Sequence, residues 1–181
     1  DSRGLQTKTR HAYYNEDDPG QDLFLPDDND DHIPRYTQTV YDGAKRPIEA
    51  RTMSRGREMW RTSSEYRGDR QLVTPADGAI PTTTIKDVRG QTVELRQHQG
   101  DTPQADYTSL TYTYTPAGQV ETVTDEEDNV WRNHYDLRGR KVRTDEPDRG
   151  TTTFVYDSAD QVVARTDARD ETIVYVYDEL G

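Results

Sequence analysis

The chain has 181 residues, of which 32% are charged and 30% are hydrophobic, and its formal net charge is −12. The acidic balance argues against binding to a nucleic-acid backbone, no apolar run approaches the ~18 residues of a membrane span, and the lack of cysteine excludes disulfides and cysteine-based zinc sites. Low hydrophobicity with high charge is typical of disorder, but 12 tyrosines and frequent threonine favour a β-structure with a thin apolar layer.

Residues 1–36 show the weakest pattern, and we interpret them as an irregular acidic segment that packs on the rest of the chain. The run from Asp27 to Asp31 begins like a calcium-binding loop. An EF-hand needs Gly at the sixth place and Glu at the twelfth, where this chain has His32 and Gln38. The EF-hand is therefore rejected, and weak calcium binding by the clustered oxygens stays open.

Residues 37–106 contain short alternating stretches between turn signals, which predict β-strands. A strand is expected to end at Tyr41, and further strands are expected at Met59–Thr62 and Gln71–Thr74. Asp87–Gly90 is predicted to form a turn, and residues 99–106 a longer loop. No stretch shows a sustained helical period.

Residues 107–181 repeat regularly. Tyr114, Tyr135, Tyr156 and Tyr177 lie 21 residues apart, and most positions two and four residues before each tyrosine hold large side chains. Because residues two apart in a strand share one face, the repeat predicts strands that each end in tyrosine and present one aromatic face. Each unit would contain two strands and two turns, with the second turn at Asp125–Asn129, Asp145–Gly150 and Asp167–Asp170.

The turn after each tyrosine has the residues that a hairpin needs. In Asp136–Gly139, Asp at the first position can hydrogen-bond the backbone two residues on, and Gly at the fourth can take the left-handed conformation. The copy after Tyr156 has Asp160 in the glycine place, and Asp tolerates that conformation better than most residues. Since one unit cannot bury its tyrosine face alone, stability must come from neighbouring units. The fold class predicted is all-β, a curved antiparallel sheet of hairpin repeats.

Four runs of sequence resemble YD repeats. They are Tyr135–Arg140, Asp145–Gly150, Phe154–Asp157 and Tyr175–Gly181. The resemblance is close over 107–181, looser over 37–106, and absent from 1–36. Such repeats belong to bacterial Rhs proteins, toxin-complex C components and, more distantly, animal teneurins. The resemblance implies a β-sheet ribbon that forms part of a larger shell around a toxic C-terminal polypeptide. The family's self-cleavage motif is not present, so no catalytic residue is carried over.

No residue pattern indicates catalysis, a cofactor or a specific metal site. The four histidines, His11, His32, His98 and His134, have no short metal-ligand spacing, and no nucleophile elbow is present. Carboxylates are too frequent to single out an acid–base pair. The tyrosine columns have two interpretations, packing across strands, which we favour, and stacking against a ligand.

The predicted function is structural. We expect a shell segment that encloses and delivers a toxic polypeptide, without catalysis in this segment, in a secreted or cell-surface bacterial protein. Its expected partners are the remainder of the same polypeptide and the enclosed toxin. The alternative is a cell-surface module that binds carbohydrate or protein.

Overall fold

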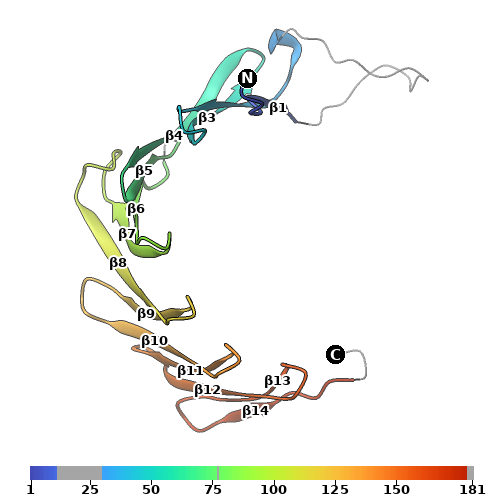
Figure 1. The fold of residues 1–181 in the computed structure, drawn as a ribbon, viewed down its shortest axis with the longest axis vertical. Coiled ribbons are helices and arrows are strands. Elements are labelled where there is room, and N and C mark those ends of the chain that lie inside the picture. Colours follow the sequence, from blue (N-terminus) through green and yellow to red (C-terminus); the bar gives the residue numbers. More distant parts are fainter. Residues whose placement is uncertain (12–29, 77, 179–181) are drawn as a thin grey trace. The chain divides into compact units, whose positions relative to one another are not determined.

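The computed structural model describes residues 1–11, 30–76 and 78–178. Within these ranges the protein is all-β, with fourteen strands that join one antiparallel sheet in the order of the sequence, from β1 to β14 (Figure 1). The helical structure in these ranges is the single 3-10 turn η1, Asp30–His32. No helix in the described part of the chain has the length and apolarity needed to cross a membrane. The predicted fold class is confirmed.

The chain divides into two compact units, the first formed by residues 1–83 and 97–106, and the second by residues 84–96 and 107–181. Strands β6 and β7 contribute residues to both units. The strands of the first unit are β1 (Lys8–Arg10), β2 (Tyr36–Tyr41), β3 (Pro47–Ser54), β4 (Arg57–Arg67) and β5 (Arg70–Thr74), followed by β6 (Thr82–Lys86) and β7 (Thr92–His98).

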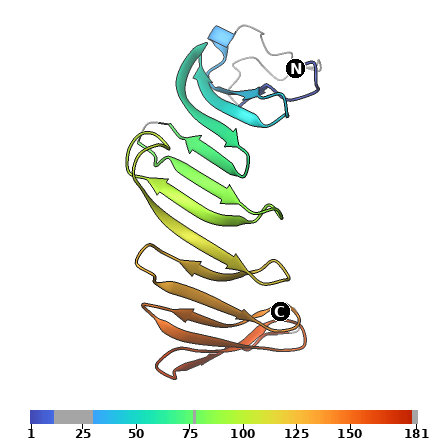
Figure 2. The same cartoon turned by 60° about the vertical axis from the view of Figure 1, so that its left-hand side comes forward.

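The second unit contains the regular repeats, and its hairpins lie side by side in Figure 2. Its strands are β8 (Tyr107–Tyr114), β9 (Val120–Thr124), β10 (Val130–Tyr135), β11 (Lys141–Glu146), β12 (Gly150–Tyr156), β13 (Val162–Thr166) and β14 (Thr172–Val174). Strands of this length match the alternating stretches of the sequence, and each strand pairs with the next along the chain.

The buried part of the first unit is small. Ile33, Tyr36 and Leu72 are its buried hydrophobic residues, with exposed fractions of 1%, 2% and 5%. The ammonium of Lys8 lies 5.1 Å from the centre of the Tyr36 ring and 2.6 Å from Asp30 Oδ1. Ile33, the most deeply buried of these side chains, lies within residues 1–36, which were predicted to be irregular.

The strands expected at Met59–Thr62 and Gln71–Thr74, the strand end at Tyr41 and the loop over 99–106 are all confirmed. Two details differ. Residues 1–36 include regular elements, β1 and η1, because β1 pairs its backbone with the edge of β2. The turn expected over 145–150 is shorter, since β11 extends to Glu146 and its register pairs Glu146 with Gly150. The first three residues of the acidic run considered for calcium binding, Asp27–Asn29, lie outside the described residues.

A bulge interrupts the register at the tyrosines that end β2, β8, β10 and β12. Tyr135 pairs with Lys141 while the residue before it, His134, pairs with Arg143, so one residue of β11 has no partner. The same shift occurs at Tyr41, Tyr114 and Tyr156. Because a bulge bends the strand and re-aims its side chain, each of these tyrosines leaves its strand in the same local geometry.

Candidate functional site: the tyrosine clasps of the sheet

Aspartate side chains close many of the turns between strands, including those that follow Tyr41, Tyr135 and Tyr156. In the turn after Tyr135, Asp136 Oδ1 accepts hydrogen bonds of 2.9 Å from the backbone N–H groups of Arg138 and Arg140. These N–H groups hold the pKa of the Asp136 carboxyl below its ordinary value, Arg140 having the largest effect. The carboxyls that close turns with the same pair of bonds are Asp1, Asp42, Asp87, Asp125, Asp136, Asp157 and Asp167.

The fourth residue of each of these turns has a positive φ. Gly139 has a φ of 81°, and Asp160 takes the same place with a φ of 66°. The sequence-based prediction of the turn geometry is confirmed, including the replacement of Gly by Asp.

Each tyrosine at the end of a repeat strand donates its hydroxyl proton to a backbone carbonyl of the preceding hairpin. We call this bond a tyrosine clasp. The hydroxyl of Tyr135 lies 2.8 Å from the carbonyl oxygen of Val120, and that of Tyr156 lies 2.8 Å from the carbonyl of Lys141. The clasps in the described residues join Tyr41 to Gln6, Tyr66 to Pro47, Tyr114 to Thr92, Tyr135 to Val120, Tyr156 to Lys141 and Tyr177 to Val162.

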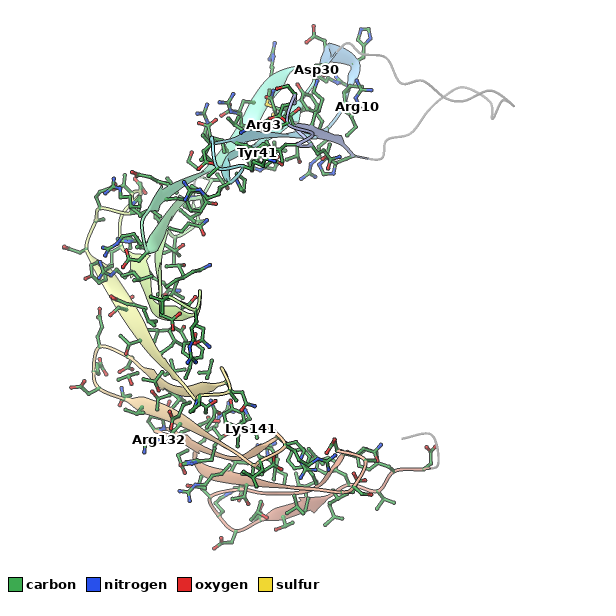
Figure 3. All side chains as sticks on the ribbon, in the orientation of Figure 1. Arg3, Arg10, Asp30, Tyr41, Arg132 and Lys141 are labelled. Carbon is green, nitrogen blue, oxygen red and sulfur yellow. The ribbon has the colours of Figure 1, made fainter. Side chains whose placement is uncertain are left out.

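The acceptor of most clasps has the same place in the repeat. In four of these six clasps it is the sixth residue after the preceding tyrosine, as Val120 follows Tyr114 and Lys141 follows Tyr135. Pro47, the acceptor for Tyr66, likewise follows Tyr41 by six residues although the two tyrosines lie 25 apart (Figure 3 labels Tyr41 and Lys141). The acceptors of Tyr114 and Tyr41 do not follow a tyrosine at this distance. Burial raises the pKa values of Tyr114 and Tyr135, so their hydroxyls remain protonated donors at neutral pH.

A second set of bonds joins successive turns along the same edge of the second unit. Gln91 donates from its amide nitrogen to the carbonyl of Gly118 at 3.2 Å, and Gln119 donates to the carbonyl of Gly139 at 2.6 Å. Arg140 continues the series, with Nη1 at 2.7 Å from Asp160 Oδ1. A hairpin is thus tied to its neighbour by the strand ladder, by the tyrosine clasp and by this turn contact.

The two faces of the sheet in the second unit differ in chemistry. The register places Tyr112, Trp131, Tyr135 and Phe154 on one face, together with the buried Thr144 and Thr152. The opposite face carries mostly threonine and charged residues. Members of this polar face are Thr111, Thr113, Thr122, Thr124, Arg132, His134, Arg143, Asp145, Thr151 and Thr153. The common face predicted for the tyrosine columns is confirmed, and the clasps support packing as the role of the repeat tyrosines.

A polar cluster on this second face surrounds Asp145. Its carboxylate lies 2.8 Å from Arg143 Nε, 2.7 Å from the Thr151 hydroxyl and 2.9 Å from His134 Nε2. Arg143 and then Thr151 hold the pKa of Asp145 far below its ordinary value, with a smaller effect of His134. A carboxylate held so strongly in its ionised form is a poor general base at neutral pH. The alternation that puts His134 on the face opposite Tyr135 is confirmed.

His98 is buried in the first unit with 5% of its surface exposed. Its Nε2 lies 2.9 Å from the Thr83 hydroxyl and its Nδ1 lies 2.9 Å from the carbonyl of Ala105. Through these two contacts His98 holds the loop over 99–106 against β6. Among the described residues, no group of three or more His, Asp or Glu side chains is placed to hold a metal ion.

Comparison with known proteins shows that the fold of this chain resembles parts of several solved structures. No protein-family model matches the sequence, and no curated protein matches it. Among solved structures, the TcdB2-TccC3 complex without its hypervariable C-terminal region is similar over 80% of this chain with 17% identity and a TM-score of 0.62. The Photorhabdus luminescens Tc holotoxin pore is similar over 83% of the chain with 16% identity and a TM-score of 0.65. This chain spans 8% of each of those chains.

These similarities define the class of fold, a β-sheet of Rhs type like that found in the Tc toxin assemblies. The identity is too low to extend the likeness beyond the fold.

Proposed function

We propose that this chain is a wall segment of an Rhs-type shell that encloses and delivers a toxic polypeptide. The observation that carries the proposal is the tyrosine clasp, which ties each hairpin to the preceding one by the same bond at successive repeats. A single-layer sheet built by such a rule can be extended without a second layer or a central core, as an enclosing wall requires. The similarity to Tc toxin structures supports the same proposal.

In this proposal the segment acts by steric enclosure and carries out no catalysis. Asp145, the carboxyl with the most strongly shifted pKa, is held in its ionised form by a salt bridge with Arg143. The proposed partners of the segment are the remainder of the same polypeptide and the enclosed toxic segment. Its proposed location is outside the producing bacterium or on the bacterial surface.

The test uses the natural polypeptide that contains this segment. We expect limited proteolysis to leave a protected fragment that is distinct from the repeats, and electron microscopy to show that fragment inside a closed wall. Substituting Tyr135 and Tyr156 together with alanine should expose the fragment to the protease at an unchanged protease concentration. A repeat array that stands open, with every other segment cleaved as fast as a denatured control, contradicts the proposal.

A further inference from the structure

The hairpin between β4 and β5 presents an Arg-Gly-Asp sequence at its tip. Arg67 is the last residue of β4, and Gly68 and Asp69 form the two-residue turn that leads to Arg70, its cross-strand partner. The strands β4 and β5 pair from Ser63 up to the turn, and β4 pairs with β3 over Arg57–Ser63, away from the tip. The three residues are thus held in one tight loop at the end of the β4–β5 hairpin.

Both charged side chains of this loop are open to solvent. The exposed fraction of the side chain is 55% for Arg67 and 54% for Asp69. Gly68 has a φ of 60°, and no atom lies within 4 Å of the place where a Cβ would stand. Solvent therefore reaches both charges, and a partner can approach the backbone at Gly68.

Asp69 differs from the aspartates of the repeat turns. Those carboxyls accept hydrogen bonds from two backbone N–H groups of their own turn, as Asp136 does, and these bonds close the turn. Asp69 instead lies inside its turn and contacts the exposed Arg70 Nε at 3.1 Å. Arg67 likewise pairs with the exposed Glu65, at 2.6 Å. Exposed ion pairs of this kind are weak, so both groups can exchange these neighbours for a partner.

We propose that the Arg67-Gly68-Asp69 loop docks to an animal cell-surface adhesion receptor of the integrin class, whose ligand site combines a bound divalent cation with an acidic pocket. The Asp69 carboxylate supplies an oxygen ligand to the cation, the kind of ligand that Mg²⁺ takes from proteins. The Arg67 guanidinium forms a bidentate bond with a carboxylate of the receptor. Gly68 lets the receptor surface reach the backbone between them.

The experiment measures binding of the full chain to a purified Arg-Gly-Asp-binding integrin ectodomain by biolayer interferometry in 1 mM Mg²⁺, a concentration on the order of that used by extracellular cation sites. We expect saturable binding that is abolished by EDTA and competed by a short linear Gly-Arg-Gly-Asp-Ser peptide. Asp69→Glu keeps the charge but moves the carboxylate by one methylene, and it should weaken binding at least tenfold. Arg67→Lys removes the bidentate geometry and should weaken it as well.

The matched control is Asp148→Glu, at the exposed tip of the hairpin between β11 and β12, where Asp148 precedes Arg149 with no glycine between arginine and aspartate. This variant should bind like the wild type. Neither Asp69 nor Asp148 closes its turn, so the thermal unfolding of both variants should match that of the wild type, which separates lost docking from lost folding. Absence of wild-type binding, binding that persists in EDTA, or equal binding by Asp69→Glu and Asp148→Glu each refutes the proposal.

Discussion

Both units contain tyrosine clasps, but the turns that join their strands differ. In the second unit, hairpins follow one another at 21 residues, and aspartates close the turns on both edges, as Asp136 and Asp167 do. In the first unit, β3, β4 and β5 are joined by two-residue turns, Arg55–Gly56 and Gly68–Asp69, and the spacing between Tyr41 and Tyr66 is 25. Tyr66 nevertheless reaches the carbonyl that follows Tyr41 by six residues. The tyrosine clasp between hairpins is therefore retained even where the 21-residue spacing of the tyrosines is not.

The first unit also contains a network of ion pairs across β3 and β4. Arg61 lies 2.7 Å from Glu58 and 3.6 Å from Glu49, and Arg51 bonds Glu49 and approaches Glu58 at 3.8 Å. These four groups alternate in charge across β3 and β4. Exposed pairs contribute little each, so the first unit should depend more on its small buried core of Ile33, Tyr36 and Leu72.

The largest effect is expected where a repeat turn has no room for a side chain. Gly150 has a φ of 71°, and a Cβ there would stand 2.7 Å from the Cβ of Ala168. Gly150→Val combines a strained backbone with a clash between neighbouring hairpins and should lower the free energy of unfolding of the second unit by about 4 kcal/mol. Urea unfolding followed by circular dichroism measures it. Gly90→Ala, at a φ of 81° with open space around it, should cost about 1 kcal/mol, and equal losses would contradict the clash.

Acid should weaken the repeat turns next. Arg140, Asn129 and Arg169 donate the bonds that lower the pKa values of Asp136, Asp125 and Asp167. A carboxyl whose pKa is lower in the folded than in the unfolded state stabilises the fold above its unfolded value, near 3.8, and this stability is lost as the pH falls through the folded value. The urea midpoint should therefore be flat from pH 7 to about pH 5 and fall below about pH 4. Asp136→Ala should have a lower midpoint at pH 7 and a shallower acid dependence, whereas a parallel dependence would contradict the assignment.

Removing single hydroxyls sharpens the comparison of the clasps. Tyr135→Phe keeps the ring but leaves the carbonyl of Val120 without its donor, and it should lower the free energy of unfolding by about 1 kcal/mol. Tyr66→Phe, whose bond to Pro47 is longer at 3.2 Å than the 2.8 Å of Tyr135, should cost less. Tyr112→Phe is the matched control, because Tyr112 lies on the same face and is not one of the clasp residues. A loss for Tyr112→Phe as large as that for Tyr135→Phe would show that the clasp adds nothing.

The smallest effect is expected for the ion pairs of the first unit. Arg61→Gln removes contacts with Glu58 and Glu49, but all three side chains reach solvent. The thermal midpoint should fall by no more than a degree or so at low salt, and the difference should vanish in about 1 M NaCl because salt screens exposed charges. A loss that persists in high salt would indicate packing by the arginine stem instead.

Much of the fold could be predicted from the sequence because its signals are local. The turn aspartates, the positive φ at Gly139 and Asp160 and the common face of Tyr112 and Tyr135 all depend on residues a few positions apart. The acceptors of the clasps could not be predicted, since the carbonyl that meets a hydroxyl depends on the bulge and on the register between hairpins. β1 was missed because its partner β2 lies far along the chain. The place of Asp69 inside its turn follows from the length of that turn, which could not be predicted from the sequence.

The clasps also have a direction. Each hydroxyl belongs to the later hairpin and each carbonyl to the earlier one, so a newly synthesised repeat finds its acceptor already in place on the part of the chain made before it. A growing ribbon can thus become ordered from its amino-terminal side as the ribosome releases it, one repeat at a time. No step of such growth has to wait for a segment that has not yet been translated.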